Sequence, residues 1–292
     1  MSEKVNLEYV NCDLCGGRDT QFVYKASTLR RETPGEFDLV KCKKCGLIYL
    51  NPRPDFASLA KFYPQDYEFH KIRKISFLER VYYKHFRNPG QPVGKILEVG
   101  CGNGNYLRLL KSLGWDCFGT EVNTDLVRHL NQDLGLKVSE GRLYELDFPQ
   151  DYFDIVTFWG ALEHMSSPLK NLTRAYKILK PGGRIIAWLQ NIESLEARVF
   201  KNYWHHLEIP THLYQFSQQT LRKMLQQAGF TIERVRFDPI SMGIVPSIGY
   251  KLNALGLNVH LNNLILKIAA LPLDLILSLF KSSGLITVYA RK

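Results

Sequence analysis

Three closely spaced glycines and two carboxylates form the pattern in this chain with the clearest chemical use. They begin in the segment Lys95-Ile-Leu-Glu-Val-Gly-Cys-Gly-Asn-Gly-Asn105. Glycines let the backbone turn sharply and let a ligand approach the main chain without a Cβ in the way. Glu121 follows some twenty residues later, at the end of the apolar run Trp115 to Thr120. An acidic side chain in that position can accept hydrogen bonds from both ribose hydroxyls. These residues predict a site for a ligand of the nucleotide type.

Glu98 narrows the choice of ligand. A dinucleotide fingerprint reads G-x-G-x-x-G and places a pyrophosphate at a helix amino terminus. This chain reads E-x-G-x-G-x-G instead, and a carboxylate suits a cationic amino group better than a pyrophosphate. The pattern resembles the S-adenosylmethionine (SAM) loop of class I methyltransferases. The simpler alternative is a glycine-rich turn that binds no ligand. The resemblance implies that SAM is bound by Glu98, Gly100, Cys101, Gly102, Gly104, Glu121, Val122, Leu143 and Trp159.

The elements that must position these residues follow in a regular order. The runs Ile96 to Val99, Trp115 to Thr120 and Asp151 to Phe158 are typical of buried strands, and helical patterns follow the glycines and span Pro168 to Leu179. The blocks Phe153-Asp-Ile-Val, Leu162-Glu-His and Leu179-Lys-Pro-Gly-Gly resemble those of class I methyltransferases that act on small molecules. This resemblance implies an α/β fold, a doubly wound Rossmann-like sheet over residues 93–238 that is completed by a last strand at Leu285 to Ala290.

Methyl transfer is an in-line displacement, and an acceptor hydroxyl or carbon acid must also lose a proton. His164 lies just past the predicted strand that ends at Phe158, and His212 lies in the loop after the next predicted strand, which follows Leu179-Lys-Pro-Gly-Gly. Each is a candidate general base, and Tyr63 and Tyr67 are predicted to fold over the site. The alternatives are that His164 caps the following helix and that Glu163 makes only a structural hydrogen bond.

Four cysteines near the amino terminus form two C-x-x-C-G pairs, Cys12 with Cys15 and Cys42 with Cys45. The segment between them contains two predicted strands that form a hairpin. Two intervening residues let both thiolates of a pair reach one tetrahedral ion. A disulfide or a redox-active pair is the alternative. We expect a structural Zn²⁺ ribbon over residues 1–50, in which protein ligands fill all four positions.

Residues 51–92 connect the ribbon to the sheet and contain Asn51-Pro-Arg-Pro54 and Phe62-Tyr-Pro-Gln-Asp-Tyr67. A ribbon, these motifs and a SAM domain together resemble zinc-containing methyltransferases of deoxysugar and cell-surface polysaccharide pathways. The resemblance implies an acceptor hydroxyl or carbon on a sugar or glycan precursor, nucleotide-linked or lipid-linked. The C-methyltransferases of that group carry a further domain, whereas about fifty residues follow Phe237 here. Two rivals are an rRNA or tRNA methyltransferase and a catalytically idle SAM-binding partner subunit.

Composition adds expectations about location and partners. The chain has 292 residues and a net charge of +10, which could favour nucleic acid, an anionic membrane or a phosphorylated substrate. No signal-like segment is evident at its start, so a cytoplasmic setting is the default expectation. The basic stretch Lys71 to Arg87 is interpreted as a solvated amphipathic helix. Residues 239–292 are expected to hold a helical insertion and the last strand. The apolar run from Leu264 to Phe280 predicts a helix pair that packs on the last strands, or a surface for peripheral membrane contact.

Overall fold

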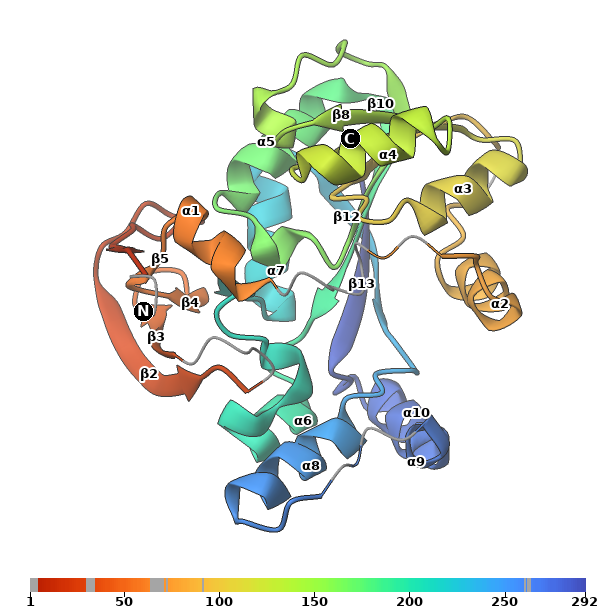
Figure 1. The fold of residues 1–292 in the computed structure, drawn as a ribbon. Coiled ribbons are helices and arrows are strands. Elements are labelled where there is room, and N and C mark those ends of the chain that lie inside the picture. Colours follow the sequence, from red (N-terminus) through yellow and green to blue (C-terminus); the bar gives the residue numbers. More distant parts are fainter. Residues whose placement is uncertain are drawn as a thin grey trace.

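A computed structural model describes residues 5–29, 35–63, 71, 73–90, 92–259, 261 and 264–292. Tyr67, predicted as a catalytic residue, lies outside the described residues. Figure 1 shows a central sheet with helices on both faces, a small amino-terminal module on one side and a helical insertion at one end.

The central sheet has seven strands in the order β12-β13-β10-β9-β6-β7-β8. Strands β6 to β10 run parallel, and β13 is antiparallel to both β10 and β12. This confirms the predicted Rossmann-like α/β fold. The strand order reverses on either side of β6, and ligands of such sheets bind beyond the carboxyl ends of the strands at that point. The strands are β6 (Lys95–Val99), β7 (Asp116–Glu121), β8 (Lys137–Glu140), β9 (Phe153–Trp159), β10 (Leu179–Gln190), β12 (Thr231–Phe237) and β13 (Leu285–Arg291).

Helices cover the two faces because each carries one apolar stripe. In α3 (Asn105–Ser112), Tyr106, Leu107 and Leu110 are buried against the same face as α4 (Thr124–Gln132). The opposite face is covered by α5 (Pro168–Ile178) and α7 (Gln218–Gln227). Three further helices before α7 are α1 (Phe56–Leu59), α2 (Phe77–Phe86) and α6 (Leu195–Phe200).

The amino-terminal module shares a sheet with a distant part of the chain. Strands β2 (Thr20–Ser27) and β3 (Glu36–Cys42) form the predicted hairpin and are longer than the sequence indicated. The sheet order is β11-β4-β3-β2, and β11 (Tyr214–Gln215) comes from the loop after β10. The module is therefore hydrogen-bonded to the loop that carries His212. Its other strands are β1 (Leu7–Glu8), β4 (Ile48–Leu50) and β5 (Arg53–Pro54).

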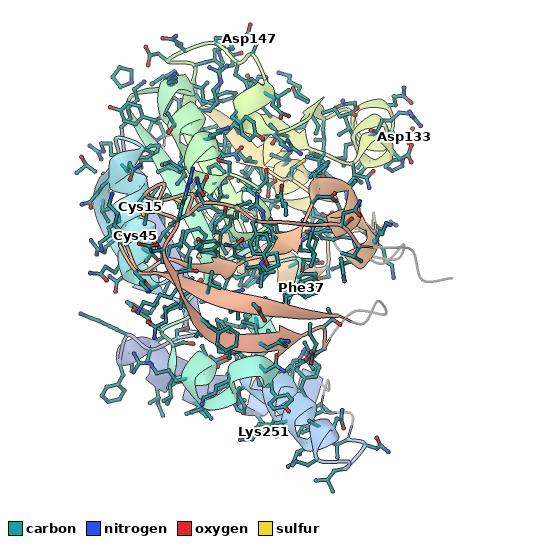
Figure 2. All side chains as sticks on the ribbon, turned by 90° about the vertical axis from the view of Figure 1, so that its left-hand side faces the viewer. Cys15, Phe37, Cys45, Asp133, Asp147 and Lys251 are labelled. Carbon is teal, nitrogen blue, oxygen red and sulfur yellow. The ribbon has the colours of Figure 1, made fainter. Side chains whose placement is uncertain are left out.

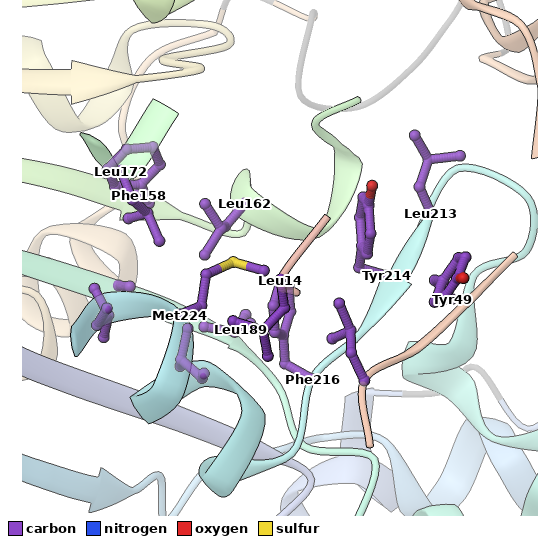
Figure 3. Packing of buried hydrophobic residues seen from close by; sticks show 14 of the residues in the cluster. Leu14, Tyr49, Phe158, Leu162, Leu172, Leu189, Leu213, Tyr214, Phe216 and Met224 are labelled. Carbon is purple, nitrogen blue, oxygen red and sulfur yellow. The ribbon is translucent and has the colours of Figure 1, made fainter. Parts of the chain in front are cut away.

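A continuous apolar core joins the module to the main sheet. Figure 3 shows Leu14 and Tyr49 of the module near Tyr214, Leu189 and Met224 in one buried cluster. Figure 2 views the molecule from the side of the module, with Cys15 and Cys45 on one end of the hairpin sheet. The module is thus packed on the sheet as part of one core, which makes its folding relevant to the site.

Asp13, between the first two cysteines, caps helix α5. Its Oδ1 accepts a hydrogen bond from the Ser167 hydroxyl at 2.7 Å, and its Oδ2 accepts one from the Leu169 amide at 2.7 Å. Asp13 therefore takes the amide of Leu169, in the helix for which a cap by His164 was considered from the sequence. A carboxylate from another part of the chain satisfies the helix amino terminus and favours its dipole.

The insertion between β12 and β13 contains α8 (Ile244–Ala254), α9 (Leu264–Ala269) and α10 (Leu271–Leu279). The predicted helix pair forms as α9 and α10, but few of its side chains are buried against the rest of the protein. Asp274 and Leu277 are buried, while Ile265 and Phe280 are 74% and 79% exposed. The Asp274 carboxylate accepts the Ser241 and Met242 amides and so holds α10 to the loop before α8.

Candidate active site

A cavity of about 1600 Å³ lies beyond the carboxyl ends of the parallel strands. This exceeds the roughly 300–1,000 Å³ of a site for one small ligand, so the cavity has room for two. It brings together almost every described residue that the sequence predicted for cofactor binding and catalysis. Those that line it are Tyr63, Glu98, Gly100, Cys101, Gly102, Glu121, Val122, Leu143, Trp159, His164 and His212.

The glycine loop has the strained backbone that its sequence indicates. Gly100 and Gly104 have φ values of 71° and 68°, a region that side chains disfavour. Gly104 is not among the residues that line the cavity. A Cβ there would come within 2.8 Å of side-chain atoms of Leu130 and Leu136. Gly104 therefore allows α3 to pack closely against α4 and the residues that follow it.

The two predicted cofactor carboxylates differ in their surroundings. Glu121 is tied to the backbone: Oε1 accepts the Val122 amide at 2.8 Å, and Oε2 accepts the Gly102 amide at 3.1 Å. It thereby joins the glycine loop to the end of β7. Glu98 is buried, and its Oε2 has no hydrogen-bond partner among the described residues. Burial raises the pKa of Glu98 to about 8, although the nearby Arg87 guanidinium opposes that shift. A cationic ligand group beside Glu98 would lower that pKa and satisfy the carboxylate.

Arg87 is a cavity residue that the sequence analysis missed. Its guanidinium lies 4.9 Å from the ring centroid of Trp159 and 4.7 Å from that of Trp188. Tyr83, one turn earlier, contacts the ring of Tyr106. The carboxyl end of α2 therefore packs over the cavity, and the solvated-helix interpretation is wrong for this end. The alternation of aromatic and basic residues between 71 and 87 was the available signal.

Glu163, His164 and His212 converge in the cavity beyond β9. One potential ligand atom from each lies within 4.8 Å of those of the other two. Nδ1 of His164 is 2.9 Å from the Thr211 carbonyl oxygen, and Nδ1 of His212 is 2.9 Å from the His206 carbonyl oxygen. A carbonyl only accepts hydrogen bonds, so each of these contacts is a hydrogen bond in the tautomer with a proton on Nδ1. In the neutral rings, both Nε2 atoms then carry a lone pair.

The charges of this group are set by burial. Burial, with a smaller contribution from the negative charge of Glu208, raises the pKa of Glu163 to about 8. Burial also lowers the pKa of His212 well below its usual value, and His164 adds to that effect. His212 is therefore neutral at physiological pH and able to accept a proton or to bind an electrophile. Glu208 is close, with Oε2 4.0 Å from His212 Nε2.

Two residues connect this group to the amino-terminal side. The Tyr63 hydroxyl lies 3.0 Å from His164 Nδ1, and Tyr63 lines the cavity. Arg53, in the Asn-Pro-Arg-Pro segment, is buried and donates to Glu8, to the Ser166 carbonyl and to the Tyr214 hydroxyl. The sequence analysis gave Arg53 no role. It links the module to the loop that follows His164.

The four amino-terminal cysteines also converge. Cys12 Sγ lies 3.4 Å from Cys45 Sγ, and Cys15 Sγ lies 3.5 Å from Cys42 Sγ. Bonds of about 2.3 Å to a tetrahedral Zn²⁺ place sulfur atoms about 3.8 Å apart, close to these separations. All four Sγ atoms lie within 4.8 Å of one another. The donor set therefore fits a structural zinc ion, which these four residues would hold.

Comparison with known proteins decides the family. A family model described as a methyltransferase domain matches residues 70–235. The chain belongs to this methyltransferase family. It is a SAM-dependent methyltransferase with a Rossmann-like fold, and the residues predicted to bind SAM, except Gly104, line the cavity at its strand ends. Family membership also favours an active enzyme over the idle partner subunit.

Relatives and solved structures agree with this assignment. The ubiquinone/menaquinone biosynthesis C-methyltransferase UbiE of Vibrio parahaemolyticus is 28% identical over 195 residues, 56% of this chain and 73% of that protein. UbiE of Burkholderia mallei is 26% identical over 191 residues, 53% of this chain and 74% of that one. A SAM-dependent methyltransferase from Archaeoglobus fulgidus superposes with a TM-score of 0.52 at 18% identity, covering 74% of this chain and 93% of that one. One from Mesorhizobium loti gives 0.50 at 19% identity, covering 72% and 97%.

Proposed function

We propose that this methyltransferase transfers the methyl group of SAM to a hydroxyl or carbon of a sugar or glycan precursor. The observation that carries the proposal is the continuity of the cavity. It extends from Glu98 and Glu121, the predicted cofactor residues, to His164 and His212 and on to Tyr63. Polar side chains and aromatic rings alternate along it, which suits the hydroxyl groups and apolar faces of a sugar ring.

In this proposal the two ends of the cavity have separate tasks. Glu98 pairs with the amino group of SAM, and Glu121 accepts hydrogen bonds from its ribose. The acceptor lies between Trp159 and the His164–His212 pair, where an Nε2 lone pair faces the proton that must leave. The methyl group is displaced from sulfur to the acceptor atom in line. The UbiE relatives are named as C-methyltransferases, which supports keeping a carbon acceptor beside a hydroxyl.

Structural zinc bound by the four cysteines is part of the same proposal. Asp13 lies between two of these cysteines and caps α5, directly after the loop that carries His164. A zinc ion would hold Asp13 in place and would therefore stabilise this side of the cavity. Because all four ligands are thiolates, the ion would have no open position for substrate.

The exposed helices α9 and α10 favour a lipid-linked acceptor. Among the described residues, no helix is long and apolar enough to cross a bilayer. Nevertheless, the pair exposes several large apolar side chains, and Lys267 of α9 and Tyr250 of α8 line the cavity. An apolar face beside basic residues is suited to the surface of an anionic membrane. The exposed side chains are Leu264, Ile265, Leu266, Ile268, Leu273, Leu275, Ile276, Leu279 and Phe280.

Incubation with labelled SAM and separate pools of nucleotide sugars, lipid-linked glycans and RNA tests the acceptor class. We expect label in a sugar-containing pool. Binding to RNA through the +10 charge would weaken steeply with salt, because counterion release scales with the phosphates contacted. A nucleotide sugar presents few phosphates, so its methylation should depend far less on salt. Label found only in RNA, with a steep loss between 50 and 200 mM salt, would contradict the proposal.

Vesicle flotation tests the membrane contact. The wild-type protein should float with vesicles that contain anionic lipid, and the double substitution I265E/F280E should reduce that fraction strongly. Leu113→Glu is the matched control, because Leu113 is 49% exposed at the end of α3, outside the helix pair. Equal flotation of all three proteins would show that the helix pair does not contact the membrane.

A further inference from the structure

The group formed by Glu163, His164 and His212 has features that a general base alone does not require. Glu163 and His164 are neighbours in a short turn (Leu162–His164) that follows β9, and His212 comes from the loop after β10. Two strands of the sheet therefore deliver three donor atoms to one point, within 4.8 Å of one another. Bonds of about 2.1 Å to a metal span donors up to about 4.2 Å apart. Small side-chain rotations would close the site around an ion.

Both imidazoles are oriented as metal ligands usually are. Nδ1 of each lies 2.9 Å from a backbone carbonyl oxygen, that of Thr211 for His164 and that of His206 for His212, and it donates to that oxygen in the tautomer with a proton on Nδ1. Such bonds fix the tautomer and the ring orientation and leave Nε2 to bind the ion. The two rings meet edge to face, with centroids 4.5 Å apart. Two neighbouring histidines that both use Nδ1 to contact a backbone carbonyl oxygen can both use Nε2 to bind one metal ion.

The Glu163 carboxyl group completes the donor set. It is only 3% exposed, and its Oε2 has no hydrogen-bond partner among the described residues. A buried carboxylate is costly unless a hydrogen bond, a charge or a metal compensates it. Glu208 is the other charged group that faces His212, and its negative charge would also favour a cation. A bound divalent ion would satisfy Glu163 without any change in the fold.

We propose that Glu163, His164 and His212 bind one divalent transition-metal ion in the cavity. Two imidazole nitrogens and one carboxylate oxygen suit Mn²⁺, Fe²⁺, Co²⁺ or Zn²⁺. All three residues line the cavity, so the remaining coordination positions face the space for the acceptor. With the ion bound, the Nε2 lone pairs of His164 and His212 are occupied, so the ion replaces the histidine base of the function proposed above. It orients an oxygen of the acceptor and makes its hydroxyl acidic enough to release the proton to water. This role in the acceptor site rests on the function proposed above, whereas the metal site itself does not.

Manganese is the probe that separates this site from the cysteines. Mn²⁺ prefers oxygen and nitrogen ligands, while thiolates select zinc. Titration of the purified protein with Mn²⁺, followed by electron paramagnetic resonance, should show one bound ion per chain. Glu163→Gln, which keeps the side-chain shape, and His212→Ala should each weaken binding at least about tenfold. His205→Ala is the matched control from the same histidine-rich loop and should bind Mn²⁺ as the wild type does.

The outcomes are distinguishable. Absence of bound Mn²⁺ at millimolar concentration, or equal binding by the Glu163→Gln protein, overturns the metal site. Loss of binding in His205→Ala to the same degree also overturns it. Circular dichroism and affinity for S-adenosylhomocysteine show that each variant is folded. If Mn²⁺ binds as expected but no sugar pool accepts label, the proposed acceptor fails while the site stands. If sugar is methylated at full rate without any ion in the site, the proposed role of the ion at the acceptor is overturned, and the metal site is then decided by the Mn²⁺ titration alone.

Discussion

The molecule gathers potential metal ligands at two places, and the two differ in what surrounds them. The four cysteines enclose their site completely, and Asp13 between them serves only to cap α5. Glu163, His164 and His212 supply three donors and leave one side open to a cavity of about 1600 Å³. Closed donor sets stabilise folds, whereas open ones leave a position for substrate. The comparison therefore predicts a structural role for the first group and a chemical role for the second.

The largest effect is expected when the closed group is broken. Cys42→Ser should remove bound zinc and unfold the amino-terminal module. Structural zinc contributes about 10–16 kcal/mol in small zinc domains, which is comparable to the whole stability of a domain. Metal analysis and thermal unfolding measure this effect. Cys117→Ser is the matched control, because Cys117 is a buried cysteine outside the group. It should keep one zinc per chain, and zinc-free wild-type protein with an unchanged melting temperature would contradict the structural role.

Breaking the open group should leave the fold intact and remove activity. His164→Ala or His212→Ala should lower turnover at least about a hundredfold, the usual scale for losing proton transfer at the acceptor. Affinity for SAM should stay the same, because the cofactor carboxylates lie at the other end of the cavity. The rate of methyl transfer from labelled SAM measures turnover, and calorimetric titration of each variant with SAM measures affinity. Full activity in both variants would mean that catalysis depends on alignment alone.

The cofactor end should give the opposite pattern. Glu121→Ala should weaken SAM binding by about 1.5–3 kcal/mol, the range for losing hydrogen bonds to a charged acceptor. Part of this loss comes from the glycine loop, because Glu121 also accepts the Gly102 amide. Isothermal titration measures the affinity, and turnover at saturating SAM should recover much of its wild-type value. An unchanged affinity would show that the ribose is bound elsewhere.

Local patterns predicted the elements well but not the contacts between distant segments. The alternation of strands and helices and the C-x-x-C spacing are readable because each depends on neighbouring residues. Asp13, Arg53 and Arg87 act across the fold, so their roles could not be read from their neighbours. The same holds for β11, which completes the sheet of the amino-terminal module from a distant loop. The glutamate of Leu-Glu-His was noticed, but its Oε2 is buried without a hydrogen-bond partner among the described residues, and this depends on the tertiary structure.

Glu196 is a buried carboxyl group outside both clusters, and it can be compared with Glu163. Both of its oxygens have hydrogen-bond partners, whereas Oε2 of Glu163 has none among the described residues. The Glu196 oxygens accept hydrogen bonds from the Ser241 hydroxyl and the Gly284 amide. Burial raises the pKa of Glu196 from 4.5 to about 7. Between these pH values the folded protein holds a proton that the unfolded chain releases. Stability should therefore fall as pH rises through this window, by at most about 1.4 kcal/mol per pH unit from this group.

Glu196→Gln should remove that slope, since an amide does not titrate. It carries a pH-independent cost, because the amide nitrogen cannot accept the hydrogen bonds that the carboxyl oxygens accept. Urea unfolding at several pH values between 4.5 and 7.5 measures the slope. Glu193→Gln, an exposed change in the same segment, should keep the wild-type slope. Because Glu196 lies outside the cavity lining, turnover should be unaffected wherever the variant is folded. If the free energy of unfolding depends on pH equally in wild type and Glu196→Gln, this carboxyl group is not protonated in the folded protein. Glu196 could then no longer serve as the buried, hydrogen-bonded carboxyl group with which Glu163 is compared.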